Sequence, residues 1–182
     1  MLLTDVELEE EWRLKRVVFK PDIDPARQIT TVSIDLRLGD EFRTPEPKAE
    51  RVFRPGRIAP PVNVDELYGP PQRFPSGQCY QLEPGDFVLG HSFERITMPL
   101  HLGAVIDGKS VNARFGLSIH ATSAKVDPGF EGQIVLEISN LGKNTLLLDP
   151  GMIICQLLFF RVSTRPKKGY SGMWQRQIAT GR

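Results

Sequence analysis

The segment that decides the fold is Gln133-Ile134-Val135-Leu136-Glu137-Ile138-Ser139-Asn140. Its isoleucine and leucine side chains fall on one side of an extended chain, and Glu137 falls on the other side. Alternation of this kind is typical of a β-strand with one buried face. We therefore predict a strand over residues 133–140, with Glu137 on the face opposite the isoleucines and the leucine.

Short strand-like segments and turn signals alternate on both sides of this strand. The segments are residues 34–38, 87–92, 146–148 and 153–162, and the turns are Pro-Gly pairs at 55–56, 84–85, 128–129 and 150–151. Pro sets the φ angle that begins a tight turn, and Gly adopts the left-handed conformation that completes one. Many short strands separated by turns predict an all-β sandwich or barrel.

Three segments depart from this pattern. Residues 4–15 are the best helix candidate, because Thr4 and Glu7 form the sequence signature of a capping box. Residues 44–78 are rich in Pro and polar residues and are expected to form a long irregular excursion. Residues 163–182 are expected to form a mobile polar tail. The chain has no internal repeat, so we expect residues 1–182 to form one domain.

The composition excludes several classes of protein. With 40% hydrophobic and 25% charged residues, the 182-residue chain has the mix of a globular domain. Its net charge of +1, from 23 Lys and Arg against 22 Asp and Glu, lacks the basic excess of a general nucleic-acid binder. No apolar run is long enough to cross a bilayer, and the acidic N-terminus lacks the pattern of a signal peptide. We expect a cytoplasmic protein that binds neither membranes nor nucleic acids.

Two common catalytic motifs do not account for the function of this chain. The zinc-dependent nucleobase deaminases hold their metal with a His-x-Glu and a Pro-Cys-x-x-Cys element, and both are missing here. The segment Gly108-Lys109-Ser110 is not interpreted as a phosphate-binding P-loop, because it follows a β segment in an all-β context. We therefore expect neither zinc nor any other metal bound directly by the protein.

The segment of residues 108–116 suits the binding of an oxyanion. If Ser110 begins a helical turn, Arg114 lies one turn later on the same side, next to Lys109. A hydroxyl, a guanidinium and an ammonium would then converge. The alternative is a short capped turn with solvated charges, and spacing alone favours this alternative.

Two carboxylates near the deciding strand are further candidates. Asp127 precedes Pro128-Gly129 and therefore lies at the mouth of a hairpin. Glu137 lies in the middle of a strand, where a carboxylate faces either a pocket or solvent. In a pocket it could transfer protons near neutral pH. Periodicity alone favours the solvent-facing alternative.

Taken together, several segments resemble the dCTP deaminase family, a branch of the dUTPase-like superfamily. The matching segments, in the family's order, are residues 33–42, 83–90, 108–116, 120–140 and 150–157. The resemblance implies a distorted jelly-roll subunit of the β-clip type and a homotrimer with active sites between subunits. It also implies deamination of dCTP to dUTP and ammonia without zinc, with Mg²⁺ bound only through the nucleotide triphosphate.

The resemblance also implies roles for individual residues. Glu137 would activate the water and relay its proton, while Ser110 and Arg114 would position the water and the developing charge. The residues implied to bind substrate are Asp127 for the sugar 3′-hydroxyl, Lys109, Lys125 and Tyr170 for the phosphates, and Ala121, Thr122 and Val126 around the base.

Departures from the family pattern keep other functions open. The family's second serine is replaced by Val111, its leucine by Asn112 and an alanine by Ser123, and the tail is only loosely similar. The alternatives are a dUTPase in which Asp127 activates water, and a non-catalytic nucleotide-binding regulator. Further cleavage of dUTP to dUMP and pyrophosphate, a modified cytosine nucleotide as substrate, and inhibition by dTTP also remain open.

Overall fold

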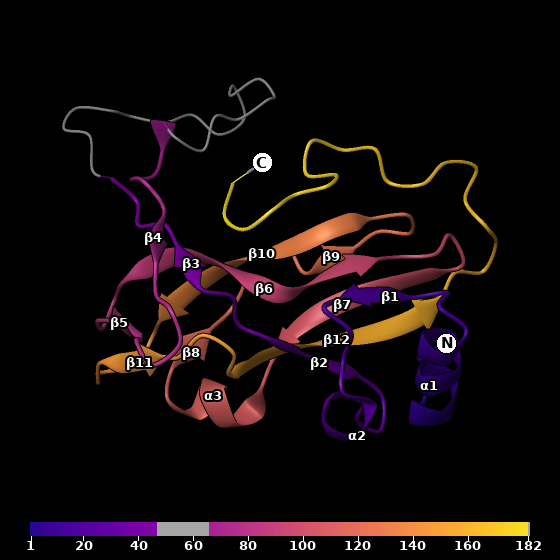
Figure 1. Cartoon of the computed structure of the whole chain (residues 1–182), viewed down its shortest axis with the longest axis horizontal. Coiled ribbons are helices and arrows are strands. Elements are labelled where there is room, and N and C mark those ends of the chain that lie inside the picture. Colours follow the sequence, from indigo (N-terminus) through magenta and orange to yellow (C-terminus); the bar gives the residue numbers. More distant parts are fainter. Residues whose placement is uncertain (47–65, 182) are drawn as a thin grey trace.

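The computed structural model describes residues 1–46 and 66–181 and consists mainly of β-strands (Figure 1). The elements in chain order are α1 (Asp5–Arg13), β1 (Val18–Lys20), α2 (Pro25–Gln28), β2 (Ile34–Arg37), β3 (Glu41–Phe42), β4 (Gln72–Arg73), β5 (Tyr80–Leu82), β6 (Phe87–Thr97), β7 (Leu102–Gly108), α3 (Ser110–Arg114), β8 (Leu117–Ser118), β9 (Lys125–Val126), β10 (Glu131–Asn140), β11 (Leu146–Leu148) and β12 (Ile153–Arg161). The prediction of an all-β fold with a short N-terminal helix is confirmed.

Two four-stranded antiparallel sheets form the body of the molecule. One has the strand order β1-β6-β10-β8 and the other β2-β12-β7-β9. Leu136 and Ile138 of β10 are fully buried, as are Leu157 and Phe159 of β12. Glu137 is only half-buried, as the alternation in the sequence predicts. The core therefore consists of the aliphatic faces of both sheets.

Small ladders and tight turns complete the sandwich. β5 pairs with β11, and β3 pairs with β4. Gly85, Gly129 and Gly151 have φ angles of +86°, +81° and +88°. Glycine adopts this left-handed conformation at little cost, so these three predicted Pro-Gly turns are confirmed. The fourth pair, at 55–56, lies outside the described residues, as does much of the predicted excursion at 44–78.

Helix α1 covers one edge of the sandwich with a single buried leucine, Leu8. The carboxylate of Glu7 accepts a hydrogen bond from the amide of Thr4 at 3.2 Å, which satisfies one free amide at the helix start. The chain turns away after Leu14, where Lys15 has a φ angle of +52°. Among the described residues, no helix has the length and apolar character that a membrane span requires.

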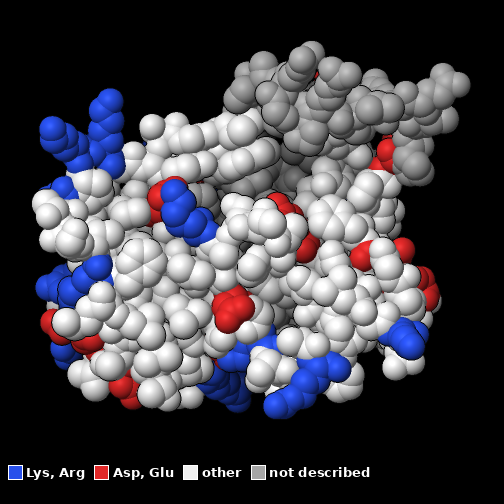
Figure 2. Space-filling model, turned by 180° about the vertical axis from the view of Figure 1, so that it is seen from behind, with Lys and Arg blue, Asp and Glu red and all other residues white. Residues whose placement is uncertain are grey.

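Charged side chains are interspersed over the face seen in Figure 2. Acidic residues lie among the basic ones, and uncharged surface separates the groups. Within the coloured part of this face, no continuous basic stripe is visible. This distribution agrees with the near-zero net charge of +1.

Candidate active site

A cavity of about 400 Å³ opens beside β10 and is the candidate active site. This volume lies within the range of small-molecule pockets in proteins. Its lining comes from residues 67–68, Ser123, β6, β9, β10, the turn after β9 and the C-terminal segment, which Figure 1 shows passing above β10. The lining includes five residues with ionisable side chains, which are Tyr68, Lys125, Asp127, Glu137 and Tyr170.

Glu137 is held in this cavity by a backbone amide. Its Oε2 atom accepts a hydrogen bond from the amide of Ala121 at 2.9 Å. On the neighbouring strand β6, Leu89 is its direct partner in the ladder and also lines the cavity. One carboxylate oxygen is thus fixed by the protein, while the side chain remains half-exposed to the cavity.

Tyr68 lines the cavity together with Glu137, and the charge of Glu137 acts on the Tyr68 phenol. Burial raises the pKa of the Tyr68 phenol, and the negative charge of Glu137 raises it further. The phenol therefore keeps its proton at neutral pH and is a hydrogen-bond donor. Sequence reasoning missed Tyr68, because nothing in the local pattern connects residue 68 with residue 137.

Asp127 and Lys125 form an ion pair in the lining of the cavity. The Lys125 Nζ atom lies 2.8 Å from Asp127 Oδ1, and both side chains are partly exposed. The amide of Phe130 donates to the carbonyl of Asp127 at 3.1 Å, which closes the turn. A carboxylate and an ammonium are thus available together for a polar ligand.

The C-terminal segment forms one wall of the cavity. The amide of Tyr170 donates to the carbonyl of Pro128 at 2.8 Å, and its ring lies 5.8 Å from that of Phe130. Near the chain end, the Thr180 hydroxyl donates to the carboxylate of Glu41 at 2.6 Å. Trp174, Gln177 and Thr180 line the cavity. Sequence reasoning placed only Tyr170 at the site, because these contacts join segments far apart in the chain.

The other predicted residues lie elsewhere in the single chain. Ser110 and Arg114 are exposed on α3, which is not part of the cavity lining. In Figure 1, α3 and the C-terminal segment lie on opposite sides of the sheets. Val126 lines the cavity, whereas Thr122 is exposed beside Ala121 and is not part of the lining. One chain therefore brings Glu137, Asp127 and Lys125 together without Ser110 and Arg114.

Lys109 is held inside the subunit by an ion pair. Its Nζ atom lies 2.7 Å from Asp35 Oδ1 on β2, and a longer contact of 3.4 Å reaches Gln156 Oε1. About a quarter of the Lys109 side chain and a tenth of the Asp35 side chain are exposed. This pair holds the residue before α3 against β2.

Residues 103–110 have the glycine spacing of a P-loop, with Gly103 and Gly108 on either side of four residues, followed by Lys109 and Ser110. A P-loop folds its intervening residues around phosphate. Here those residues belong to β7, where Gly103 pairs with Phe160 of β12. A Cβ atom on Gly103 would lie 2.7 Å from the Phe160 ring. Close packing accounts for this glycine, and the extended strand excludes a phosphate-binding loop.

Among residues 1–46 and 66–181, no three His, Cys, Asp or Glu side chains gather in a way that could hold a metal ion. The cavity itself contains two carboxylates, Asp127 and Glu137. The first is paired with Lys125 and the second with the amide of Ala121. The chemistry that these residues offer is acid–base chemistry and recognition of polar groups.

Curated relatives agree with the resemblance found in the sequence. A family model described as dCTP deaminase-like matches residues 2–162. A relative from Dictyoglomus thermophilum, named "dCTP deaminase, dUMP-forming", is 35% identical over 170 residues, which are 93% of this chain and 85% of the relative. Another from Halorubrum lacusprofundi, named "dCTP deaminase", is 38% identical over 172 residues, which are 93% of this chain and 82% of the relative.

The fold also matches a solved structure. The crystal structure of 2′-deoxycytidine 5′-triphosphate deaminase from Agrobacterium tumefaciens aligns with a TM-score of 0.68 and 24% identity. The alignment covers 89% of this chain and 49% of that chain, so this chain spans about half the length of that protein. This match assigns the class of fold. The family model and the relatives add that the chain belongs to the dCTP deaminase-like family.

Proposed function

We propose that this chain deaminates dCTP to dUTP and ammonia, with Glu137 as the group that transfers protons. The observation that carries the proposal is the position of Glu137, whose carboxylate lies in a cavity of about 400 Å³ with one oxygen held by the Ala121 amide. The names of the relatives from Dictyoglomus and Halorubrum support the choice of dCTP. A dUTPase would have no need of a proton-transferring carboxylate beside the base.

In the proposed reaction, Glu137 removes a proton from a water molecule, and the oxygen of that water adds to C4 of cytosine. Glu137 passes this proton to the ring nitrogen N3. A second transfer, from the new hydroxyl through Glu137 to the amino group, lets ammonia leave and forms the carbonyl of uracil. One carboxylate can do this because it is regenerated after each transfer.

We propose that Ser110 and Arg114 reach the cavity from a neighbouring copy in a homotrimer. Both residues are exposed in the single chain, and their helix lies on the other side of the sheets from the C-terminal segment (Figure 1). In a shared site, the Arg114 guanidinium and the Ser110 hydroxyl would stabilise charge that develops as water adds.

The remaining cavity residues are proposed to hold the nucleotide. Asp127 would accept a hydrogen bond from the sugar 3′-hydroxyl, and Lys125 and Tyr170 would contact the phosphates. Mg²⁺ bound to the triphosphate would reduce its negative charge. The ion pair with Asp35 gives Lys109 a structural role and makes it a weaker candidate for phosphate binding. Ala121, Thr122 and Val126 would surround the base.

The test replaces Glu137 with glutamine. Glu137→Gln keeps the shape of the side chain but cannot act as a base, so dCTP turnover should fall by about 10²- to 10⁴-fold. Affinity for dCTP should change much less. The matched control is Glu131→Gln, which removes a second carboxylate of β10 that pairs with Arg95 outside the cavity lining. Turnover of Glu137→Gln within threefold of the parent would remove the proposed role.

The parent protein should be assayed with dCTP, dCMP and dUTP in the presence of Mg²⁺, with and without dTTP as a competitor. Ammonia and dUTP from dCTP are the expected products. The Dictyoglomus relative is named as dUMP-forming, so pyrophosphate should be measured in the same reactions. Cleavage of dUTP without any deamination of dCTP would favour the dUTPase alternative.

A further inference from the structure

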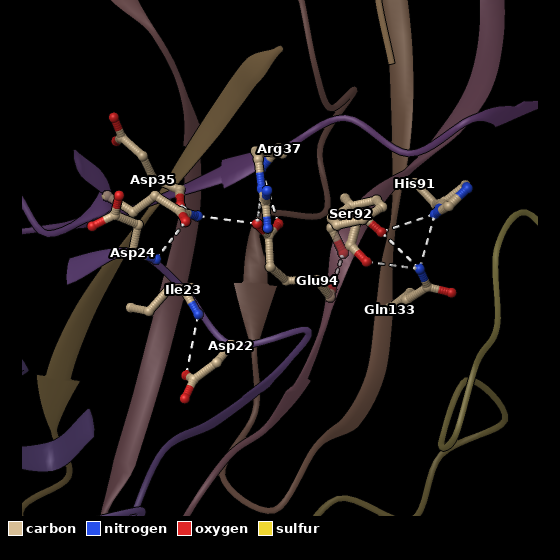
Figure 3. A network of polar contacts seen from close by, with 11 residues as sticks. Asp22, Ile23, Asp24, Asp35, Arg37, His91, Ser92, Glu94 and Gln133 are labelled. Carbon is tan, nitrogen blue, oxygen red and sulfur yellow. Dashed lines mark hydrogen bonds and ion pairs between the residues drawn. The ribbon is translucent and has the colours of Figure 1, made fainter. Parts of the chain in front are cut away.

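The ladder between β6 and β10 is interrupted beside the cavity. Gln133 pairs with Arg95, but the next pair is Val135 with His91. One residue of β10, Ile134, therefore faces three residues of β6, which are residues 92–94. This β6 bulge, defined by residues 92–94, lies in the network that Figure 3 shows.

Side chains satisfy the backbone groups that the β6 bulge leaves without ladder partners. The Ser92 hydroxyl accepts a hydrogen bond from the amide of Ile134 at 2.9 Å and donates to the carbonyl of Glu94 at 2.7 Å. The Gln133 amide group donates to the carbonyls of Ser92 at 3.0 Å and Phe93 at 3.2 Å. Ser92 is fully buried, so water cannot replace its hydroxyl.

An ion pair between the buried Glu94 and the partly exposed Arg37 holds the other end of the β6 bulge. The carboxylate of Glu94 is fully buried and accepts hydrogen bonds from Arg37 Nε at 2.6 Å and from the Arg37 amide at 2.9 Å. The side chain of Gln28 donates a third hydrogen bond at 3.0 Å. Because Arg37 belongs to β2, these bonds join the β6 bulge to the second sheet. Figure 3 shows Arg37 and Glu94 in the middle of the network, with Ser92 and Gln133 to their right.

The β6 bulge determines which residue lies opposite Glu137. In an uninterrupted ladder, the pairing of Gln133 with Arg95 would continue to a pairing of Glu137 with His91. The observed partner is Leu89, which is 7% exposed and lines the cavity. The interruption also lets two consecutive residues, Ile134 and Val135, line the same cavity. Bulges are known to redirect side chains next to active sites.

We propose that Ser92 is a positioning residue for the reaction of Glu137. By joining the Ile134 amide to the Glu94 carbonyl, its hydroxyl fixes the offset between β6 and β10. That offset sets the position of Glu137 relative to Leu89 and the Ala121 amide. The inference rests on the proposed deamination, but it assigns Ser92 no contact with the substrate.

The test compares Ser92→Ala with Ser92→Thr. Ser92→Ala removes the hydroxyl, so kcat for dCTP per folded enzyme should fall roughly 10- to 100-fold, as expected when a catalytic group is displaced by about 1 Å. The Kd for dCTP should rise less than kcat falls. Ser92→Thr keeps a hydroxyl and should recover most of kcat. All rates are measured well below the melting temperature of each variant.

Thr30→Val is the control for a purely structural effect. Thr30 is part-buried, its hydroxyl donates to the carbonyl of Ser33 at 3.1 Å, and it does not line the cavity. This variant should lose stability and keep the parental kcat. If Ser92→Ala does not fold, Ser92→Cys replaces it, since a thiol is a weak donor and acceptor and kcat should still fall several-fold.

Two failures can be told apart. If the parent does not deaminate dCTP, the proposed function fails, and crystal structures of the parent and Ser92→Ala then test the offset directly. An unchanged pairing of Glu137 with Leu89 in Ser92→Ala would overturn the inference. If the parent is active, parental kcat in folded Ser92→Ala or Ser92→Cys would overturn it, because Ser92 would then contribute to stability alone.

Discussion

At the scale of single residues, His91 is held as a neutral imidazole next to the β6 bulge. It is 3% exposed, and its Nε2 atom accepts a hydrogen bond from the amide of Glu41 at 3.3 Å. Its Nδ1 atom therefore carries the proton and donates to the carbonyl of Ser92 at 2.8 Å. Burial lowers the pKa of His91 below 6.5, although the hydrogen bond to the Ser92 carbonyl and the charges of Asp40 and Glu41 act in the opposite direction. Protonation would place a second N–H against the Glu41 amide.

This arrangement predicts a loss of stability in weak acid. Between the lowered folded pKa of His91 and the unfolded value of 6.5, the unfolded chain binds a proton that the folded chain does not. Stability should therefore decrease as the pH falls through 6.5 toward the lowered folded pKa of His91. The pKa of Glu41 is lowered from 4.5, so its contribution is lost only in stronger acid.

Urea unfolding at several pH values measures this effect. His91→Gln should be less stable than the parent near neutral pH but should show a flatter pH dependence. The control is His101→Gln, which replaces a histidine that does not line the cavity. The His101 side chain is partly exposed, and its Nε2 atom lies 2.9 Å from Oε2 of Glu11. A parental pH dependence in His91→Gln would contradict the prediction.

The sequence predicts part of the candidate site at this scale. Alternation along residues 133–140 predicts that Glu137 lies opposite Leu136 and Ile138, because side-chain direction in a regular strand follows parity. The same alternation is wrong for Ile134, which lines the cavity together with Val135 and Glu137 because the ladder is interrupted there. The Pro-Gly pair likewise locates Asp127 at a turn. The residues that surround Glu137 and Asp127 in the cavity cannot be predicted in this way. Tyr68, Trp174 and Thr180 reach the cavity through long-range contacts that leave no local pattern in the sequence.

At the scale of elements, the connection between β2 and β3 crosses β6 at a glycine. An ideal Cβ atom on Gly39 would overlap the imidazole ring of His91. The ring cannot easily move away, because its two nitrogens bond to the Glu41 amide and the Ser92 carbonyl. Gly39 is therefore required by the close approach of these elements, and its φ angle is not in the left-handed range.

Gly39→Ala should destabilise the protein by about 1–3 kcal/mol, the usual cost of an extra methyl group in a packed interior. The free energy of unfolding in urea measures this change. Gly181→Ala is the matched control, since its nearest contact to an added Cβ would be an ordinary 3.9 Å. Equal stability of the two variants would show that the connection adapts to the extra atom.

Strand β6 is longer than the sequence predicts. The predicted strand ends at residue 92, whereas β6 continues to Thr97. Ser92 and Glu94 are polar and therefore resemble the end of a strand, yet both are fully buried. Their polar groups are satisfied by Arg37, Gln28 and the Ile134 amide. Such compensation depends on the tertiary structure, so residue patterns within β6 could not reveal it.

At the scale of the whole molecule, the predicted catalytic residues fall into two groups. Glu137 lies in the cavity under the C-terminal segment, whereas Ser110 and Arg114 are exposed on α3 across the sheets (Figure 1). A closed symmetric assembly can unite two such groups, because each copy then presents one group to each neighbour. The sequence predicts Glu137, Ser110 and Arg114 as catalytic residues. The proposal that they meet between subunits concerns the assembly and cannot be tested on one chain.

Subunit mixing tests this union. Glu137→Gln and Arg114→Ala should each be inactive alone, and a trimer of the 20.5 kDa chain is expected by light scattering. When the two variants are unfolded, mixed in equal amounts and refolded, about one quarter of shared sites should combine an intact Glu137 with an intact Arg114. Activity should therefore return to about a quarter of that of the refolded parent. The control refolds each variant separately and mixes the products without exchange. If the co-refolded mixture forms trimers but stays inactive, Glu137 and Arg114 do not meet across a subunit boundary.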